Sequence, residues 1–454
     1  MTEQIIRIQE EIQGAKLNRF HYLIAILVGL LTLFDGFDTF NPAYVIHYVI
    51  GPWGLKPASA GLLVSSGLIG FLIGSAVHGV IADRIGRRKT LIGGFFIACV
   101  FTLATALFAR SFESFCIIRF LTGLGLGVLL PLGTTYINEL APKRTANVFT
   151  IWGVAFGWAL GGTLAGIVGV LVTPTWGWQG IYYAGSGFFL LLVPLYLYLP
   201  ESVRFLETTN RDNEIRALLS RIRPDRAGFY NSDAIIEKPV RTAVKGGVIA
   251  LLSPRYRRLT LSIWASAFLI LFCIFGLSAW IPNIMIQRGE AFSRSFSFGA
   301  LLQISSFVGG LACGWISDKR GSSRVALAAW WLIGAGSVLM MALFNTHWVN
   351  FIGVIAAGTF VVGGQFVLNN YTSSVYETGI RATGVGMELA VGRIGAILGP
   401  FVAGFLQQVF NGSFAMFIAI CVASFVAALI IGTTRQRQYS VSDHAGHQMS
   451  PELR

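Results

Sequence analysis

The sequence predicts an all-α membrane protein in which twelve transmembrane helices form two pseudo-symmetric six-helix bundles. Three observations predict this fold: the composition, the number of long apolar runs, and a repeat that relates the two halves of the chain. Of 454 residues, 54% are hydrophobic and only 12% are charged, which is far from the balance of a soluble domain. We therefore expect a polytopic protein whose main partner is the lipid bilayer.

Twelve apolar runs each approach the length of about 20 residues that a helix needs to cross a bilayer. They cover residues 21–46, 58–82, 90–109, 112–138, 146–172, 178–199, 259–286, 296–317, 325–345, 348–375, 383–410 and 412–432. The first run is too long for a cleaved signal peptide, so we expect it to remain as the first span.

The positions of the basic residues predict the orientation. With twelve spans and the N-terminus inside, most of the 34 Lys and Arg residues fall on the cytoplasmic side. The outer loops hold only Lys56, Arg110, Arg288 and Arg294. This asymmetry follows the positive-inside rule, so we expect both termini on the cytoplasmic side of the membrane. The net charge of +13 then leaves no basic patch for a nucleic acid, and we expect no nucleic-acid partner.

The two halves of the chain repeat one pattern of charges and glycines. Asp83 follows the second run and Asp318 the eighth, while Glu139 and Glu377 follow the fourth and tenth. Three glycines of the fifth run recur exactly 238 residues later in the eleventh: Gly157, Gly161 and Gly166 match Gly395, Gly399 and Gly404. Such repetition predicts two related bundles, and closely spaced glycines predict close contacts between helices.

The repeat and the composition together divide the chain into five parts. We expect a cytoplasmic N-terminal segment over residues 1–20 and a cytoplasmic tail over 434–454. Between them we expect a first bundle over 21–200, a solvated cytoplasmic linker with short surface helices over 201–256, and a second bundle over 257–433. Ile5, Ile8 and Ile12 could line one face of a short helix in the first segment.

Two carboxylates interrupt the first apolar run. Asp35 and Asp38 are three residues apart, on one face of a helix, in a setting where a charged acid costs several kcal/mol or more. Acids in such positions usually share a proton, face a wet cavity or pair with a cation. We interpret them as a proton-binding site in a transport path, and the alternative is a buried pair that serves only structure.

Only two basic residues lie within the runs, Arg119 in the fourth and Arg393 in the eleventh. Counting 1.5 Å per residue places Arg119 at the depth of Asp35, so Arg119 is the expected partner of Asp35 or Asp38. Arg393 falls about 15 Å deep, near the midplane, where transporters bind their substrates. A guanidinium can hold a carboxylate through two parallel hydrogen bonds, so Arg393 is the expected substrate anchor. Glu388 lies about 140° around the same helix and need not pair with it.

The remaining candidates for the substrate site are mostly aromatic. Planar side chains beside these charges suit a planar ligand, although many aromatics of such a chain face lipid. The substrate-binding set is Arg393, Arg119, Asp38, Phe37, Phe40, Tyr44, Trp152 and Glu388. The proton-coupling set is Asp35, Asp38, Arg119 and Glu139.

Catalytic motifs are not found. The sequence shows no metal cluster, no nucleophile and base arrangement and no phosphate-binding G-x-x-x-x-G-K-[ST] run. The five cysteines lie in apolar runs without C-x-x-C spacing, so they read as packing residues. We expect no enzyme activity, no cofactor and no metal, and we expect a monomer.

Several motifs resemble one known family. The run from Gly79 to Arg88, G-x-x-x-D-R-x-G-R-R, resembles the loop signature of the major facilitator superfamily. Arg119 followed by Gly123, Gly125 and Gly127 is similar to the fourth-span motif of that superfamily. The D-G-x-D of residues 35–38 and the region around Arg381 and Arg393 resemble its aromatic acid:proton symporters.

The resemblance implies the major facilitator fold and the uptake of a benzoate-like or hydroxybenzoate-like anion with protons by alternating access. It also implies gating contacts at the cytoplasmic side, made by Asp83, Arg84, Gly86, Arg87, Arg88, Asp318, Glu377 and Arg381. The chain departs from the family pattern at Glu377, often a proline, and at Glu388, where an uncharged residue is expected. Two alternatives stay open: symport of another organic anion, such as a dicarboxylate or a nicotinate-like ring, and a transporter-like sensor that binds without flux.

Overall fold

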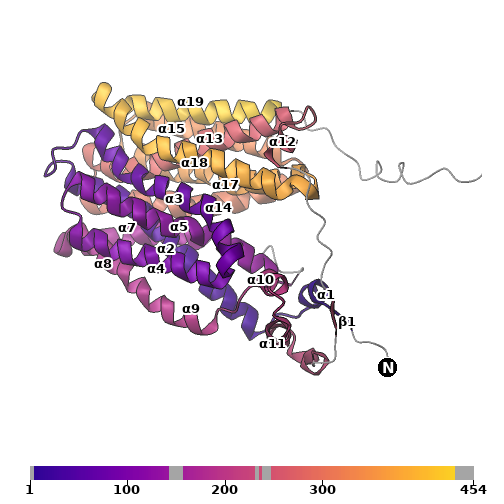
Figure 1. Cartoon of the computed structure of the whole chain (residues 1–454). Coiled ribbons are helices and arrows are strands. Elements are labelled where there is room, and N and C mark those ends of the chain that lie inside the picture. Colours follow the sequence, from indigo (N-terminus) through magenta and orange to yellow (C-terminus); the bar gives the residue numbers. More distant parts are fainter. Residues whose placement is uncertain (1–4, 143–156, 231–234, 238–246, 435–454) are drawn as a thin grey trace, which may run out of the picture.

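Two bundles of long helices lie side by side in the computed structural model, which describes residues 5–142, 157–230, 235–237 and 247–434 (Figure 1). Within these residues, twelve helices are long and apolar enough to cross a membrane. The predicted fold class is therefore confirmed.

The first half supplies six of these spans. They are α2 (Arg19–Val49), α3 (Pro57–Ile85), α4 (Arg87–Phe108), α5 (Phe112–Leu140), α7 (Gly157–Trp176) and a sixth made of α8 (Gln179–Ser186), η2 (Gly187–Leu191) and α9 (Leu192–Tyr198). Asn18 caps α2, since its side chain accepts hydrogen bonds from the backbone N–H groups of Phe20 and His21.

The second half supplies the other six. They are α13 (Arg257–Gln287), α14 (Phe292–Arg320), α15 (Ser323–Leu343), a tenth span made of α16 (His347–Ala357), η4 (Gly358–Val362) and α17 (Gly364–Val375), then α18 (Thr378–Val409) and α19 (Phe414–Thr433). The segment η4 is a turn of π-helix, which places an extra residue in one turn.

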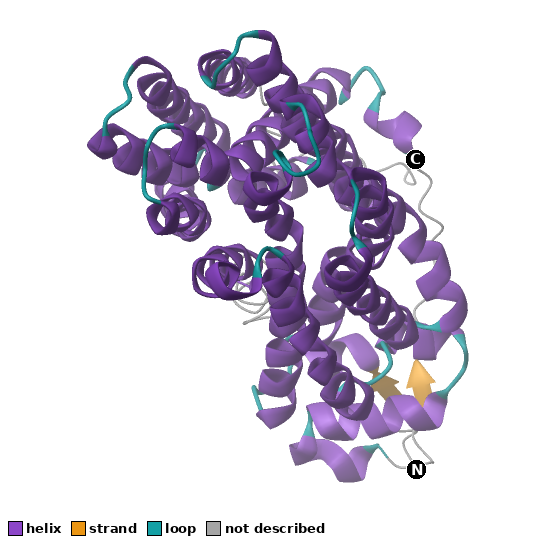
Figure 2. Ribbon diagram, turned by 90° about the vertical axis from the view of Figure 1, so that its left-hand side faces the viewer, coloured by secondary structure: helices purple, strands orange, loops and turns teal. Residues whose placement is uncertain are grey.

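Short elements gather at one end of the molecule, which we call the linker end. They are β1 (Ile5–Arg7), α1 (Ile8–Gln13), α10 (Val203–Thr208), α11 (Asp212–Ile222), η3 (Pro224–Phe229), β2 (Ile235–Glu237) and α12 (Val248–Leu251). The strands β1 and β2 pair in parallel, with Ile6 opposite Ile236, and lie side by side near the N-terminus (Figure 2). This small sheet was not predicted.

The linker is not simply a solvated segment. Ile215, Leu218, Leu219 and Ile222 of α11 are buried together with Ile8 and Ile12 of α1, in a cluster that continues into the core of the first half. Glu11 fixes this packing, because it accepts hydrogen bonds from Arg223, Arg226 and Tyr230. Ile8 and Ile12 share a buried helix face, while Ile5 lies in β1 and is exposed.

The repeated glycines make equivalent contacts in the two halves. A Cβ atom at Gly161 of α7 would lie 2.1 Å from the Leu33 carbonyl oxygen of α2. A Cβ atom at Gly399 of α18 would lie 2.5 Å from the Phe272 carbonyl oxygen of α13. Both distances are far inside van der Waals contact, so only glycine lets the fifth helix of each half approach the first helix this closely.

Candidate functional site

Asp38 and Arg119 form a buried ion pair between α2 and α5. Arg119 Nη1 lies 2.7 Å from Asp38 Oδ2, and Arg119 Nη2 donates to the Asp38 carbonyl oxygen at 2.9 Å. Thr102 of α4 donates to Asp38 Oδ1 at 2.7 Å. The Asp38 side chain is fully buried, and Arg119 lies over the Tyr182 ring at 5.6 Å. Of the two carboxylates predicted as partners for Arg119, the structure pairs it with Asp38.

Asp35 lies in a different environment. It is fully buried, and Oδ1 accepts a hydrogen bond from Thr39 at 3.3 Å. In the part of the chain that the structure describes, Oδ2 has no hydrogen-bond partner. Asp35 interacts electrostatically with Arg393 of α18, although no ion pair within 4 Å joins the two groups among these residues. The cation that acts electrostatically on Asp35 thus belongs to the other half of the molecule.

Arg393 packs on an aromatic ring and not on a carboxylate. Its guanidinium carbon lies 3.7 Å from the centre of the Phe71 ring of α3, which holds the planar group in a cation–π contact. Within the described ranges, no Asp or Glu oxygen lies within 4 Å of it. Among the described residues, the hydrogen-bonding fork of Arg393 is therefore not occupied by a carboxylate.

Glu388 does not pair with Arg393, in keeping with their separation around α18. Glu388 is fully buried and accepts a hydrogen bond from Gln365 of α17 at 3.3 Å. It lies inside the second half, away from the cation that the sequence grouped with it.

The predicted aromatic residues occupy three places. Phe40 packs on Trp158 of α7 and Phe275 of α13, with ring centres 4.9 and 6.1 Å away, at the contact between the halves. Phe37 instead packs on Phe188 of η2 at 6.0 Å, within the first half. Tyr44 packs on Phe296 of α14 at 5.1 Å. Trp152 lies outside the described residues.

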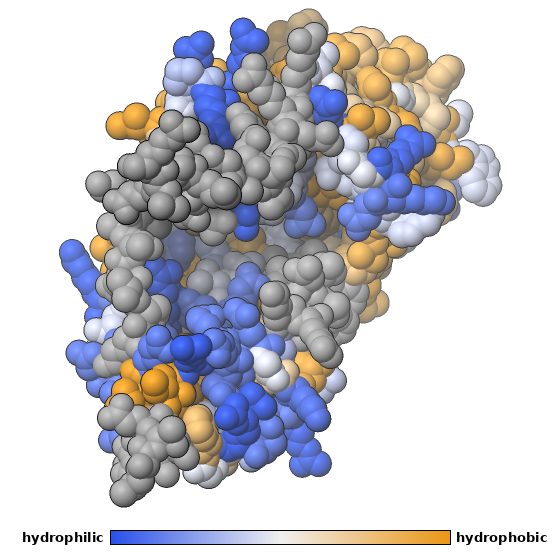
Figure 3. Space-filling view, turned by 90° about the vertical axis from the view of Figure 1, so that its right-hand side faces the viewer, coloured by the Kyte–Doolittle hydropathy of each residue, from blue (hydrophilic) through white to orange (hydrophobic). Residues whose placement is uncertain are grey.

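The two halves meet tightly at the end opposite the linker. Ser65 of α3 donates to the Ile397 carbonyl of α18 at 2.6 Å, and a Cβ atom at Gly404 would lie 2.3 Å from the Pro57 carbonyl oxygen. A second contact between the halves joins α2 to α14, where Tyr44 and Tyr48 pack on Phe296. The linker end is hydrophilic and is hollowed between the halves (Figure 3). The molecule is thus closed at the end opposite the linker, while its surface is hollowed at the linker end (Figure 3).

Predicted gating residues of the first half form a network at the linker end. Arg87 pairs with Glu139, which follows Arg119 by 20 residues of α5, or about 30 Å. Glu139 is therefore far from Asp38 and belongs with these linker-end charges. Gly86 has φ +100°, a conformation that favours glycine, and links α3 to α4. Asp83 and Arg84 are exposed.

Glu201 is a member of this network that the sequence analysis missed. It accepts from the backbone N–H of Arg88 at 2.9 Å, near the start of α4. A carboxylate is favourable there because the first N–H groups of a helix lack partners. Arg88 also lies over the Tyr196 ring at 5.4 Å. Glu201 follows the sixth apolar run, on the same side of the membrane as the arginine-rich loop of residues 84–88. This position is a signal that could have identified Glu201.

The second half does not repeat these contacts. Glu377 pairs with Arg255, just before α13, at 2.6 Å. Arg381 donates to the Tyr376 carbonyl at 3.4 Å, and the Asp318 side chain is exposed. Arg324, in the matching loop, donates to the Thr434 carbonyl. The matching charges of the repeat therefore have different partners in the two halves.

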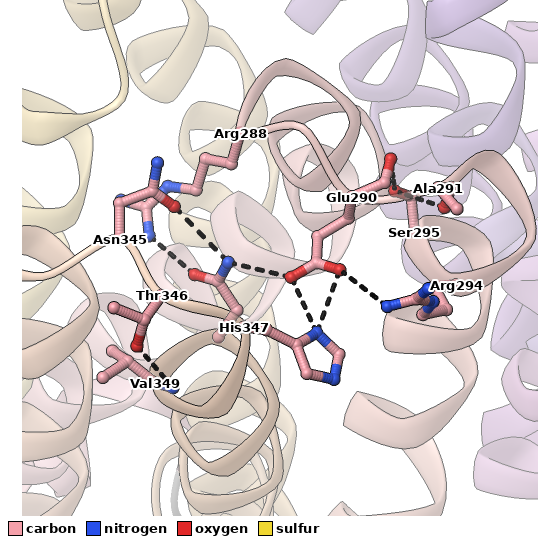
Figure 4. A network of polar contacts seen from close by, with 10 residues as sticks. Arg288, Glu290, Ala291, Arg294, Ser295, Asn345, Thr346, His347 and Val349 are labelled. Carbon is pink, nitrogen blue, oxygen red and sulfur yellow. Dashed lines mark hydrogen bonds and ion pairs between the residues drawn. The ribbon is translucent and has the colours of Figure 1, made fainter.

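A polar network joins two loops of the second half at the closed end (Figure 4). Glu290, between α13 and α14, contacts His347 Nδ1 at 3.0 Å and accepts from Asn350 at 3.3 Å. Arg288 donates to Asn350 at 2.9 Å and to the Met341 carbonyl at 2.6 Å. Burial opposes ionisation of Glu290, but its contacts with His347, Asn350 and Arg294 outweigh burial and hold the pKa of Glu290 below its usual range.

The Glu290 network predicts a pH-dependent part of the stability. Because the pKa is lowered on folding, the stabilisation is present above the usual pKa of about 4.3 and is lost as pH falls through the lowered value. In thermal unfolding between pH 7 and 3, Glu290→Gln should lower the Tm at pH 7 and reduce its fall in acid. Glu214→Gln, at an exposed pair with Arg211, is the control and should change neither. Equal acid sensitivity of Glu290→Gln and the parent protein would contradict the assignment.

The two membrane carboxylates should differ in their contribution to stability. Breaking a buried ion pair costs about 3–5 kcal/mol, because the remaining charge loses its partner. Asp38→Asn should therefore lower the Tm strongly, and Asp35→Asn much less, since Thr39 is the one hydrogen-bond donor that the described residues give Asp35. Thermal unfolding of both variants in detergent measures this difference. An equal loss of Tm would show that Asp35 is also a structural ion-pair partner.

Comparison with known proteins supports one family. A family model described as the Major Facilitator Superfamily matches residues 26–324. A gallate transporter of Pseudomonas putida is 33% identical over 428 residues, which cover 94% of each chain. The 4-hydroxybenzoate transporter PcaK of Acinetobacter baylyi is 30% identical and aligns over 93% of this chain and 92% of its own.

Solved structures show the same fold at low sequence identity. The partially occluded, inward-open structure of the xylose transporter XylE from Escherichia coli superposes with a TM-score of 0.71 at 18% identity. The superposition covers 93% of this chain and all of the other. At this identity the likeness concerns the arrangement of helices alone.

Proposed function

This chain belongs to the major facilitator superfamily, and we propose that it is a proton-coupled transporter that imports an aromatic carboxylate by alternating access. Its relatives are transporters, and it is not an enzyme. The substrate that we propose is a benzoate-like or hydroxybenzoate-like anion, in line with the gallate and 4-hydroxybenzoate that name two relatives.

One observation carries this proposal: Arg393 is a cation without a carboxylate partner among the described residues, and its guanidinium carbon lies 3.7 Å from the centre of the Phe71 ring. A substrate carboxylate can accept two parallel hydrogen bonds from the guanidinium. Phe71 holds the fork in position. The Phe40, Trp158 and Phe275 rings pack together at the contact between the halves, and we propose that the aromatic ring of the substrate inserts among them when the halves move.

Proton coupling is proposed for Asp35. When Asp35 is ionised, it attracts Arg393 across the boundary between the halves. A proton on Asp35 removes that competing negative charge, so the substrate carboxylate can take its place beside Arg393. Proton and anion then cross together, because neither occupies the site favourably without the other. Asp38 and Arg119 keep α2 and α5 joined and hold Asp35 at the right depth.

Alternating access is supported by the asymmetry between the two ends. The end opposite the linker is closed by direct contacts of α3 with α18 and of α2 with α14, while the linker end is hollowed (Figure 3). The positive-inside rule assigns the linker end to the cytoplasm. The state described here is then open to the cytoplasm, and both termini lie there. We propose a monomer in the bacterial inner membrane, with a first bundle over residues 21–200, a cytoplasmic linker over 201–256 and a second bundle over 257–433.

Purified protein in sealed proteoliposomes tests this function. A panel of gallate, benzoate, hydroxybenzoates, nicotinate and a dicarboxylate is first ranked by thermal shift, and the best ligands are then tested for flux with and without a pH gradient. Flux of an aromatic carboxylate that collapses with an uncoupler supports the proposal. A preference for the dicarboxylate, or tight binding without flux, would instead support one of the two alternatives.

A further inference from the structure

The first membrane helix carries two cavities on one face, near the linker end. The first is a cleft of about 460 Å³ between the start of α2 and the end of α11. Its lining residues are Asn18, Arg19, Phe20, Leu23, Arg221 and Pro224. Arg19 is the first residue of a helix that crosses the membrane, so the cleft lies at the level of the lipid headgroups.

This cleft is basic and has fixed walls. Arg19 and Arg221 are exposed, and neither has an acidic group within 4 Å in the described part of the chain. Arg221 lies over the Phe20 ring at 4.9 Å. Asn18 ties the two walls together, since its amide donates to the carbonyls of Arg221 and Ile222, both at 3.0 Å, while its oxygen caps α2. Two exposed arginines thus line one cleft, and the end of α11 that carries Arg221 is tied to the start of α2.

The second cavity is an apolar groove of about 400 Å³ deeper along the same helix. It is lined by Leu30, Ala184, Gly187, Phe188, Leu190, Leu191 and Pro194. Leu23 of the cleft and Leu30 of the groove are seven residues apart, which places them on one face of α2 about 10 Å from each other. Ile26 lies between them and is 52% exposed, and Leu190 is 80% exposed.

We propose that the cleft and the groove together form a binding site for an anionic phospholipid. The phosphate group binds between Arg19 and Arg221, and one acyl chain runs past Leu23 and Ile26 into the groove. The pattern fits a lipid and not a soluble anion, because the basic cleft and the apolar groove lie on one face of α2, with the exposed Ile26 between them and the groove further towards the hydrocarbon core. Each basic residue near a membrane surface contributes about fivefold to the binding of anionic lipid.

The site is also connected to the proton-binding helix. Phe188, which lines the groove, packs on Phe34 and Phe37 with ring centres 5.3 and 6.0 Å away. These two residues flank Asp35 in the sequence of α2. An acyl chain in the groove would therefore contact Phe188, which packs on the two phenylalanines next to Asp35. The lipid site does not depend on the proposed substrate or on proton coupling.

Native mass spectrometry of the purified full chain tests the site, with phosphatidylglycerol and phosphatidylethanolamine as competing probes. Three variants are compared with the parent. R19Q/R221Q removes both cleft charges. R257Q/R258Q removes two exposed charges at the start of α13, the matching position of the second half. Gly187→Leu fills the groove, where an added Cβ would meet no atom within 4 Å.

We expect the parent and R257Q/R258Q to prefer phosphatidylglycerol, and R19Q/R221Q to bind it about tenfold or more weakly. Gly187→Leu should weaken binding of long-chain phosphatidylglycerol but not of a six-carbon-chain form. Equal binding by R19Q/R221Q and R257Q/R258Q would overturn the proposal, as would displacement of the lipid by an equal concentration of inorganic phosphate. If R19Q/R221Q does not fold, the chain-length effect of Gly187→Leu decides.

Discussion

Arg393→Ala is expected to weaken the binding of an aromatic carboxylate by about 30-fold or more and to abolish its transport at low concentration. Hydrogen bonds to a charged group in a desolvated site contribute about 2 kcal/mol or more, and the substitution removes both of them with the charge. Substrate affinity by thermal shift or calorimetry, together with initial uptake rates in proteoliposomes, measures the effect.

Arg393→Lys is the matched control for this prediction. It keeps the positive charge but loses the planar fork that lies over the Phe71 ring, so its affinity should lie between those of the parent and the alanine variant. The Tm without ligand should fall only modestly in both variants, since Arg393 loses its contact with Phe71 but has no ion pair within 4 Å among the described residues. Unchanged affinity in Arg393→Ala would show that the substrate carboxylate binds elsewhere.

Asp35→Asn is expected to uncouple transport from protons. The parent protein should accumulate substrate about tenfold for each pH unit and each proton carried, because one pH unit corresponds to a factor of ten in proton activity. An amide cannot exchange a proton, so the variant should show no accumulation driven by a pH gradient. It should still exchange labelled for unlabelled substrate, since Arg393 remains available.

The Asp35→Asn experiment separates coupling from binding and from folding. Loss of both accumulation and exchange, with a normal Tm, would mean that Asp35 contacts the substrate and does not serve as the proton carrier. Thr39→Val is a useful companion, because it removes the hydrogen-bond donor of Asp35 and leaves the carboxylate in place. Its accumulation should persist with a shifted pH dependence.

Most of the fold could be predicted from the sequence, because a bilayer restricts the structures that a chain can adopt within it. A bilayer requires long apolar helices, so the twelve runs, the two halves and the glycine contacts could all be expected from composition and spacing. Helix ends were less predictable. The structure extends α14 to Phe292–Arg320, beyond the predicted 296–317, because backbone hydrogen bonding continues through polar residues outside the apolar run.

The candidate site was only partly predictable. Depth along a helix follows from counting residues, so the contact between Arg119 and the acids of α2 was accessible. The choice of Asp38 depends on the rotation of α2 against α4 and α5, where Thr102 also contributes. Phe71 could not be linked to Arg393, because that contact joins α3 to α18 across the two halves. The pairing of β1 with β2 joins strands of three residues more than 200 residues apart, which no periodicity reveals.

The most direct test of proton coupling at Asp35 is the proton uptake that accompanies substrate uptake. Proteoliposomes in a weakly buffered medium receive an aromatic carboxylate, and the external pH is recorded for the parent protein and for Asp35→Asn. We predict that the medium becomes alkaline with the parent and not with the variant, although both bind the compound. A parent protein that moves the substrate without moving protons, or a variant that still takes up protons, would contradict this mechanism.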